Sequence, residues 1–140
     1  MIRLERVVDT LPAGLDEMRA EARAEGHRML DTLAAEWESG QNRFQREGEA
    51  LFAAYLGDTL AGIGGLTTEP TIPGGYRMRR FYVRIACRRS GVARNLALRL
   101  LGGTFSHTVT ANAAGGSESF WEALGFVPNR RDGYSHSLTR

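Results

Sequence analysis

The chain has 140 residues, 42% of them hydrophobic, and its 18 basic and 16 acidic side chains give a formal net charge of +2. This length predicts one domain over residues 1–140, and no run approaches the roughly 18 apolar residues that a membrane span needs. The single cysteine, Cys87, excludes an internal disulfide, and the sequence shows neither metal-ligand spacing nor a signal peptide, so we expect a cytoplasmic protein without a metal.

The first half of the chain predicts one strand, two helices and a hairpin. Residues 2–8 have the composition of a strand, and residues 13–39 carry apolar side chains at helical spacing, with a break near Gly26. Two apolar runs between residues 49 and 66 flank the dipeptide Gly57-Asp58, which is typical of a β-hairpin turn.

The second half alternates strands and helices. We expect a strand over 76–84, a helix over 90–101, a strand over 107–111, a helix over 118–124 that ends at Gly125, and one final edge strand marked by the alternation of Tyr134, His136 and Leu138. This order predicts an α/β fold in which a single sheet is covered by helices.

Positive charge is concentrated in one segment. Residues 1–75 carry seven arginines and thirteen acidic side chains, whereas residues 76–99 carry eight arginines and no acidic side chain. Apolar residues such as Phe81 and Val83 interrupt this basic segment, so it belongs to a folded element and favours an anionic ligand such as phosphate. Lysine is absent from the whole chain, which is typical of a GC-rich bacterial genome.

The basic segment surrounds the predicted start of a helix at Arg88-Arg89-Ser90-Gly91. The first backbone N–H groups of a helix have no internal partner and lie at the positive end of its dipole. Gly91 would let a ligand approach the backbone closely, so these residues predict an anion site. The sequence lacks the lysine of a Walker loop and the G-x-G-x-x-G dinucleotide motif, and the alternative is a solvated basic helix start without a ligand.

Two blocks of sequence resemble the GNAT family of N-acetyltransferases. The run FYVRIACRRSGVARNLALRLL is similar to the family's acetyl-CoA motif, a strand followed by R/Q-x-x-G-x-G/A and a helix, with Arg88, Gly91 and Ala93 at the defining positions. SESFWEALGF resembles the family's later helix that ends in Leu-Gly-Phe. The early helices and the hairpin have the same order, so the resemblance covers nearly the whole chain. It implies a mixed, mostly antiparallel central sheet with helices on both faces.

The resemblance also implies a binding site for acetyl-CoA. Backbone amides of the turn and of the first helical residues would hold the pyrophosphate, and the strand edge at Val83 and Ile85 would pair with the pantetheine arm. Asn112 matches a position that often contacts the cofactor arm. The expected cofactor-binding residues are Tyr82, Val83, Ile85, Arg88, Arg89, Ser90, Gly91, Val92, Ala93, Arg94, Asn112 and Trp121.

The catalytic groups of the family are not all present. Family members often have a tyrosine as general acid where this chain has Trp121, and an indole has no usable acidic proton, so we expect Trp121 to pack or to line the cofactor arm. Our candidate acid is Ser119, with Ser117, Tyr134 or water as alternatives.

For the general base, relatives carry a glutamate on the strand where this chain has Arg77, so we turn to Glu69, next to Pro70. A carboxylate near a cleft and beside apolar residues would have a raised pKa; the alternative is a solvated loop glutamate. Other candidates are Glu36, Glu38, His107 and His136, with Cys87 as a less favoured covalent nucleophile.

We therefore expect an acyl-CoA-dependent N-acetyltransferase that passes acetyl directly to a primary amine of a small molecule or peptide. The acidic first half favours a cationic acceptor. The resemblance to the GNAT family also implies a homodimer, since dimers are common in that family. Two alternatives belong to other classes: a catalytically silent coenzyme A sensor or partner-binding module, and a DNA-recognition helix with Arg94, Asn95 and Arg99 exposed. The second is disfavoured because a strand, not a helix, precedes that turn, so we expect neither nucleic acid nor membrane as a partner.

Overall fold

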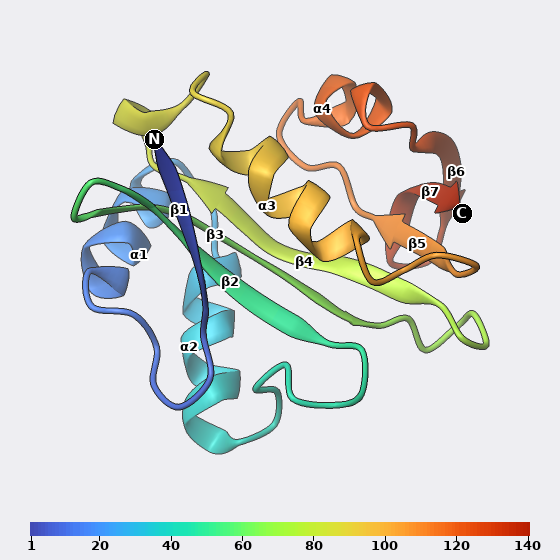
Figure 1. The fold of residues 1–140 in the computed structure, drawn as a ribbon, viewed down its shortest axis with the longest axis horizontal. Coiled ribbons are helices and arrows are strands. Elements are labelled where there is room, and N and C mark those ends of the chain that lie inside the picture. Colours follow the sequence, from blue (N-terminus) through green and yellow to red (C-terminus); the bar gives the residue numbers. More distant parts are fainter.

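The computed structural model describes all residues from 1 to 140 and contains seven strands, four α-helices and one short 3₁₀ helix (Figure 1). In chain order these are β1 Ile2–Arg6, α1 Leu15–Ala24, α2 Met29–Ser39, β2 Ala50–Leu56, β3 Thr59–Thr68, β4 Tyr76–Val83, the 3₁₀ turn Ile85–Cys87, α3 Val92–Leu101, β5 Thr108–Ala111, α4 Glu118–Ala123, β6 Val127–Arg131 and β7 Tyr134–Thr139.

All seven strands form one sheet in the order β1-β2-β3-β4-β5-β7-β6. Every neighbouring pair is antiparallel except β4 and β5, which are parallel, so the expected mixed, mostly antiparallel sheet is confirmed. β4 and β5 pair only at Tyr76 with Val109 and at Arg77 with Thr110. Beyond Arg77, the edge of β4 that faces β5 has no strand partner, and the sheet splits open there.

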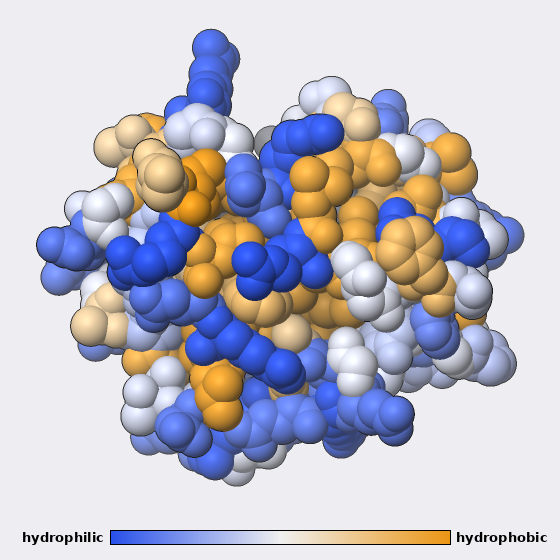
Figure 2. Space-filling model, viewed as in Figure 1, coloured by the Kyte–Doolittle hydropathy of each residue, from blue (hydrophilic) through white to orange (hydrophobic).

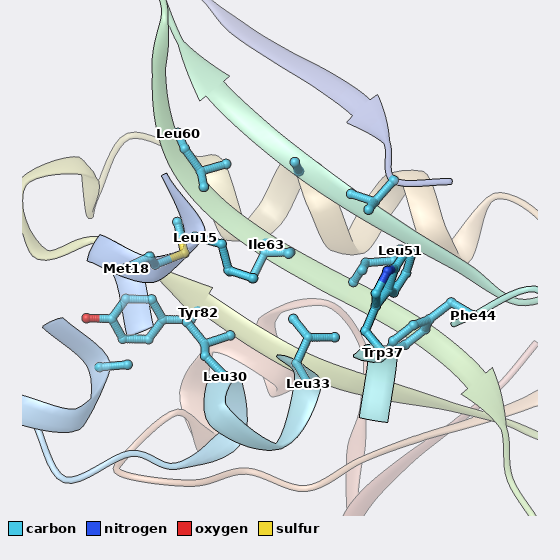
Figure 3. Close-up of a cluster of buried hydrophobic side chains, with 13 residues drawn as sticks. Leu15, Met18, Leu30, Leu33, Trp37, Phe44, Leu51, Leu60, Ile63 and Tyr82 are labelled. Carbon is cyan, nitrogen blue, oxygen red and sulfur yellow. The ribbon is translucent and has the colours of Figure 1, made fainter. Parts of the chain in front are cut away.

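Helices cover both faces of this sheet, as predicted. α1 and α2 pack on one face, where Leu15, Met18 and Leu33 meet Leu51 of β2 and Ile63 of β3 (Figure 3). Each of these five side chains is at most 4% exposed. Burial of one such side chain is worth about 1.5–3 kcal/mol, so this cluster fixes the two early helices against the sheet.

The opposite face carries α3 and α4, which share a second hydrophobic cluster that includes Ala97, Leu100, Trp121 and Phe126. Figure 2 looks onto the face where α3 lies and shows hydrophilic and hydrophobic side chains interleaved over it. The outline of the molecule is indented between the turn before α3 and α4, where Figure 1 places the open end of the sheet.

The expectation of one final edge strand was wrong. The last residues form a hairpin of two strands around Gly133, and β7, which holds His136, lies inside the sheet between β5 and β6. The edge is β6, with the sequence VPNRR and mostly exposed side chains. An edge strand of this kind has no buried face, so it shows no hydrophobic alternation and its sequence predicts a loop.

Candidate functional site

The split between β4 and β5 holds a cavity of about 470 Å³. Its walls come from β4 between Arg77 and Val83, the start of α3, the segment after β5 together with α4, and the α1–α2 turn. The lining residues are Glu25, His27, Met29, Arg77, Met78, Arg79, Arg80, Phe81, Tyr82, Val83, Arg88, Ala93, Asn112, Ala114, Gly115, Ser117, Phe120 and Trp121. The cavity therefore combines half of the predicted cofactor residues with a group of arginines.

The start of α3 lies beside this cavity and presents unpaired backbone donors. The structure records no hydrogen bond from any of the six consecutive backbone N–H groups between Arg89 and Arg94. No side chain caps the helix, and its N-cap is Gly91, which has a φ of +86°. Arg89 is also left-handed, with a φ of +63°. These alternating conformations expose a row of amides at the positive end of a helix dipole, which is the arrangement that binds anions.

The helix itself folds as its sequence predicts. Val92, Leu96 and Leu100 are buried against the sheet, whereas Arg94 and Asn95 are exposed. Packing of this apolar stripe holds the helix end in place, so the free amides are fixed without support from a ligand.

Arg88, expected to add charge to the anion site, has a partner within the protein. Its guanidinium makes two hydrogen bonds to the carboxylate of Glu25, at 2.6 and 2.9 Å. The hydroxyl of Tyr82 lies 2.5 Å from the same carboxylate and 3.0 Å from that of Glu21. Hydrogen bonds from Arg88 and Tyr82 lower the pKa of Glu25 to about 2, while burial and the two carboxylates raise the pKa of Tyr82. Arg89, by contrast, makes no ion pair.

The two backbone groups expected to pair with pantetheine also have internal partners. The carbonyl of Val83 accepts a hydrogen bond from Nε of Arg88 at 3.0 Å, and the amide of Ile85 donates to the carboxylate of Glu21 at 2.9 Å. A ligand that pairs with these groups must first displace the two side chains.

Trp121 is 5% exposed and packs edge-to-face on three rings, those of Phe81, Phe120 and Phe126, at centroid distances of 5.1, 4.9 and 5.3 Å. It also lines the cavity, as does the exposed Asn112 at the end of β5. Trp121 therefore has the packing position that its lack of an acidic proton suggested.

Neither predicted catalytic residue lines the cavity. Ser119 is exposed on α4, whereas Ser117 lines the cavity.

Glu69, the candidate base, is only 3% exposed, so its carboxylate is not solvated. Burial alone would raise its pKa, but hydrogen bonds from Thr71 and Thr110 and the charge of Arg77 outweigh burial and leave the pKa below its ordinary value. The expected raised pKa was wrong, because the sequence does not show these hydroxyl partners.

The other candidates lie in structural contacts. His136 is buried between the hydroxyl of Ser135 and the carboxylate of Glu122, at 2.8 and 2.9 Å. His107 contacts the carbonyl of Gly74 at 2.8 Å. The remaining candidates, Glu36, Glu38, Cys87 and Tyr134, are all absent from the lining of this cavity.

Sequence reasoning missed His27, which lines the cavity from the α1–α2 turn and makes an edge-to-face contact with the ring of Tyr82 at 6.4 Å. It also missed the role of β4 as the wall that carries Arg77, Arg79 and Arg80 into the cavity. The run of arginines can be read from the sequence, but their position relative to the cavity depends on a bulge in β4 that the sequence does not predict.

None of the helices has the length and apolar character needed to cross a bilayer.

Comparison with known proteins identifies similar sequences and folds. The model of the acetyltransferase (GNAT) domain family matches residues 18–139. An assigned acetyltransferase from Exiguobacterium sp. 255-15 superposes with a TM-score of 0.89 at 21% identity, over 99% of this chain and 93% of that one. A protein assigned to the GNAT family from Desulfovibrio desulfuricans superposes at 0.72 with 19% identity, over 99% of each chain.

A further solved structure contains a ligand. The N-acetyltransferase YlbP of Bacillus subtilis, in complex with coenzyme A, superposes with a TM-score of 0.69 at 16% identity, over 100% of this chain and 97% of that one. No curated protein sequence matches the chain. At these identities the solved structures establish a shared fold, and the family match extends that likeness to the sequence.

Proposed function

This chain belongs to the GNAT acetyltransferase family, whose members use acetyl-CoA, and from that premise we propose that it passes acetyl directly to the primary amine of an acceptor. One observation carries the proposal: six unpaired backbone amides at the start of α3 lie beside a cavity that the split sheet keeps open. An N-terminal helix end without internal acceptors is suited to a pyrophosphate.

The residues present fit acetyl-CoA along this path. The amides from Arg89 to Arg94 would hold the pyrophosphate, and the guanidinium of Arg89 supplies a charge without a partner. The open edge of β4 at Val83 would receive the pantetheine arm once Arg88 releases the carbonyl there. Trp121 and Phe81 provide an apolar wall. Acetyl-CoA supplies the reactive thioester.

His27 is our candidate for the proton transfer that amide formation requires. The amine nitrogen must lose a proton as its bond to the acyl carbon forms, and the departing sulfur must gain one. Histidine is the side chain that ordinarily exchanges protons near neutral pH, and His27 lines the cavity with a ring that makes no hydrogen bond within the protein. Glu25 is unsuited because its lowered pKa, about 2, makes it a weak base, and Tyr82 is unsuited because its raised pKa makes it a weak acid.

The test combines binding with turnover. Calorimetry should detect acetyl-CoA binding at 200 mM salt, because neutral hydrogen bonds to pantetheine are weakly screened, and adenosine 3′,5′-bisphosphate alone should bind more weakly. Release of free thiol that requires the added primary amine and is matched by formation of the acetylated amine would then establish transfer. Acetyl-CoA binding without thiol release across a broad amine panel would favour a sensor, and equal affinity for the fragment would contradict the assignment of the pantetheine path.

A further inference from the structure

A bulge in β4 gathers three arginines on one side of the strand. In a regular strand, neighbouring side chains point to opposite faces. Here the pairing with β3 shifts near Gly64, and Arg80 adopts a left-handed φ of +61°. As a result Arg80 bonds to Glu36 of α2 at 2.9 Å, while Arg79 lines a polar cavity beside that same glutamate. Bulges of this kind redirect side chains next to active sites.

The bulge is built into the packing of the sheet. A Cβ on Gly64 would lie 2.9 Å from the ring of Phe81, so only a glycine leaves room for that ring against β3. A left-handed arginine costs free energy, which the surrounding structure must offset. The arrangement of Arg79 and Arg80 is therefore a defined feature of the fold and not a chance contact of two flexible side chains.

These arginines carry more positive charge than their surroundings neutralise. Only Arg80 forms an ion pair, with Glu36, and its Nε is buried without any hydrogen-bond partner. Arg77 donates to the carbonyl of Gly133, and Arg79 donates to the hydroxyl of Thr67 at 3.3 Å, but neither has a carboxylate within ion-pair distance. Burial and the neighbouring charges of Arg77 and Arg80 lower the pKa of Arg79, whereas the carboxylates of Glu36 and Glu69 act in the opposite direction.

Two cavities meet at this cluster. Arg79 lines both the cavity of about 470 Å³ between β4 and β5 and a second cavity of about 600 Å³ whose lining contains no hydrophobic residue. The first contains the expected path of the cofactor, so the polar cavity offers a separate route for an acceptor. Two acidic side chains, Glu36 and Glu49, line this polar cavity, and both have partners within the protein. Glu36 pairs with Arg80, and Glu49 accepts hydrogen bonds from the backbone N–H groups of Arg46 and Thr68.

From this geometry we propose that the acceptor is a small primary amine that also carries an anionic group, a carboxylate or a phosphate, held by Arg79 with Arg77 and Arg80 where the two cavities meet. The guanidinium fork fits both anions. This inference rests on the proposed acetyl transfer and reverses the cationic acceptor that the charge distribution of the sequence favoured.

The test uses acceptors that differ only in the anion. Glycine would be compared with glycinamide, β-alanine with propylamine, and phosphoethanolamine with ethanolamine, with kcat/KM followed by thiol release; the pairs separate carboxylate from phosphate. The anionic member should be about tenfold to a hundredfold better, the range expected for a charge-assisted contact. Arg79→Gln should abolish the preference through KM without changing acetyl-CoA affinity, whereas Arg130→Gln, an exposed change of equal charge outside both cavities, should retain it.

The outcomes separate this inference from the transferase assignment. Acetylation of neutral or polycationic amines as efficiently as of anionic ones would overturn the anionic acceptor and leave the transferase standing. If no amine is acetylated, calorimetry of the same pairs in the presence of coenzyme A decides: binding of the anionic members that depends on Arg79 supports the site and refutes the enzyme, while no binding refutes both. Arg77→Gln provides the same comparison if the Arg79 variant does not fold.

Discussion

Substitution of Gly91 separates the backbone conformation of the proposed anion site from its space. Gly91 has a φ of +86°, and a Cβ there would meet only Asn95 Nδ2 at 3.6 Å and Ile2 Cδ1 at 3.9 Å, which are ordinary contacts. The residue is therefore restricted by its dihedral angle and not by crowding within the protein. Valine adopts this region poorly, whereas asparagine tolerates it.

Gly91→Val and Gly91→Asn should differ in acetyl-CoA affinity, because the two side chains differ in how well they tolerate the left-handed backbone angle. If the valine of Gly91→Val kept the left-handed angle, the free energy of unfolding would fall by about 1–2 kcal/mol. If the chain relaxed, the amides from Arg89 to Arg94 would turn away from the ligand, and loss of even one charge-assisted hydrogen bond costs about 1.5–3 kcal/mol, or roughly tenfold to a hundredfold in Kd. We expect the second result for Gly91→Val and a change of no more than about threefold for Gly91→Asn, since asparagine can keep the angle.

Calorimetric titration of acetyl-CoA into each variant measures the affinity, and urea denaturation measures the stability. Equal weakening by valine and asparagine would mean that side-chain bulk, not the orientation of the amides, decides binding. Unchanged affinity in a folded Gly91→Val protein would refute the assignment of the pyrophosphate to this helix end.

Three further changes test other parts of the site. His27→Gln should lower kcat by about a hundredfold or more at unchanged acetyl-CoA affinity, and activity within a few-fold of the parent would remove His27 from the mechanism. Trp121→Phe should cost about 1–3 kcal/mol in urea denaturation because a buried ring system shrinks, yet turnover should stay within a few-fold; a much larger loss in a folded protein would assign the indole a chemical role. Glu25 contributes stability that is present above its unfolded pKa of 4.5 and is lost as pH falls toward about 2, so urea denaturation of Glu25→Gln should show a smaller loss between pH 5 and 3 than the parent, and identical slopes would contradict the ion pair with Arg88.

The sequence was informative wherever one local pattern decides the structure. The hairpin around Gly57-Asp58, the stripe of α3 and the break near Gly26 all appear as expected, because periodicity and turn residues act over a few positions. β6 was missed because an exposed edge strand buries nothing that would leave a pattern.

Misjudgements at the site came from long-range pairing. The pairing of Glu25 with Arg88 joins residues 63 positions apart, and Glu69 meets Thr110 across 41 positions. Such contacts depend on the complete topology, so composition alone assigned free charge to Arg88 and an elevated pKa to Glu69. His27 was overlooked for the same reason, since nothing near it in the chain marks it as part of a cavity wall.

The divergence of β4 from β5 also bears on the tendency of the ligand-free protein to aggregate. An unpaired strand edge inside a sheet is a template for strand addition from another chain, and so a starting point for aggregation. Here Glu21 and Arg88 occupy the amide of Ile85 and the carbonyl of Val83, both on the stretch that follows the divergence. Charged side chains thus cover these two backbone groups, and charge placed along an open strand edge disfavours the addition of a strand from another chain.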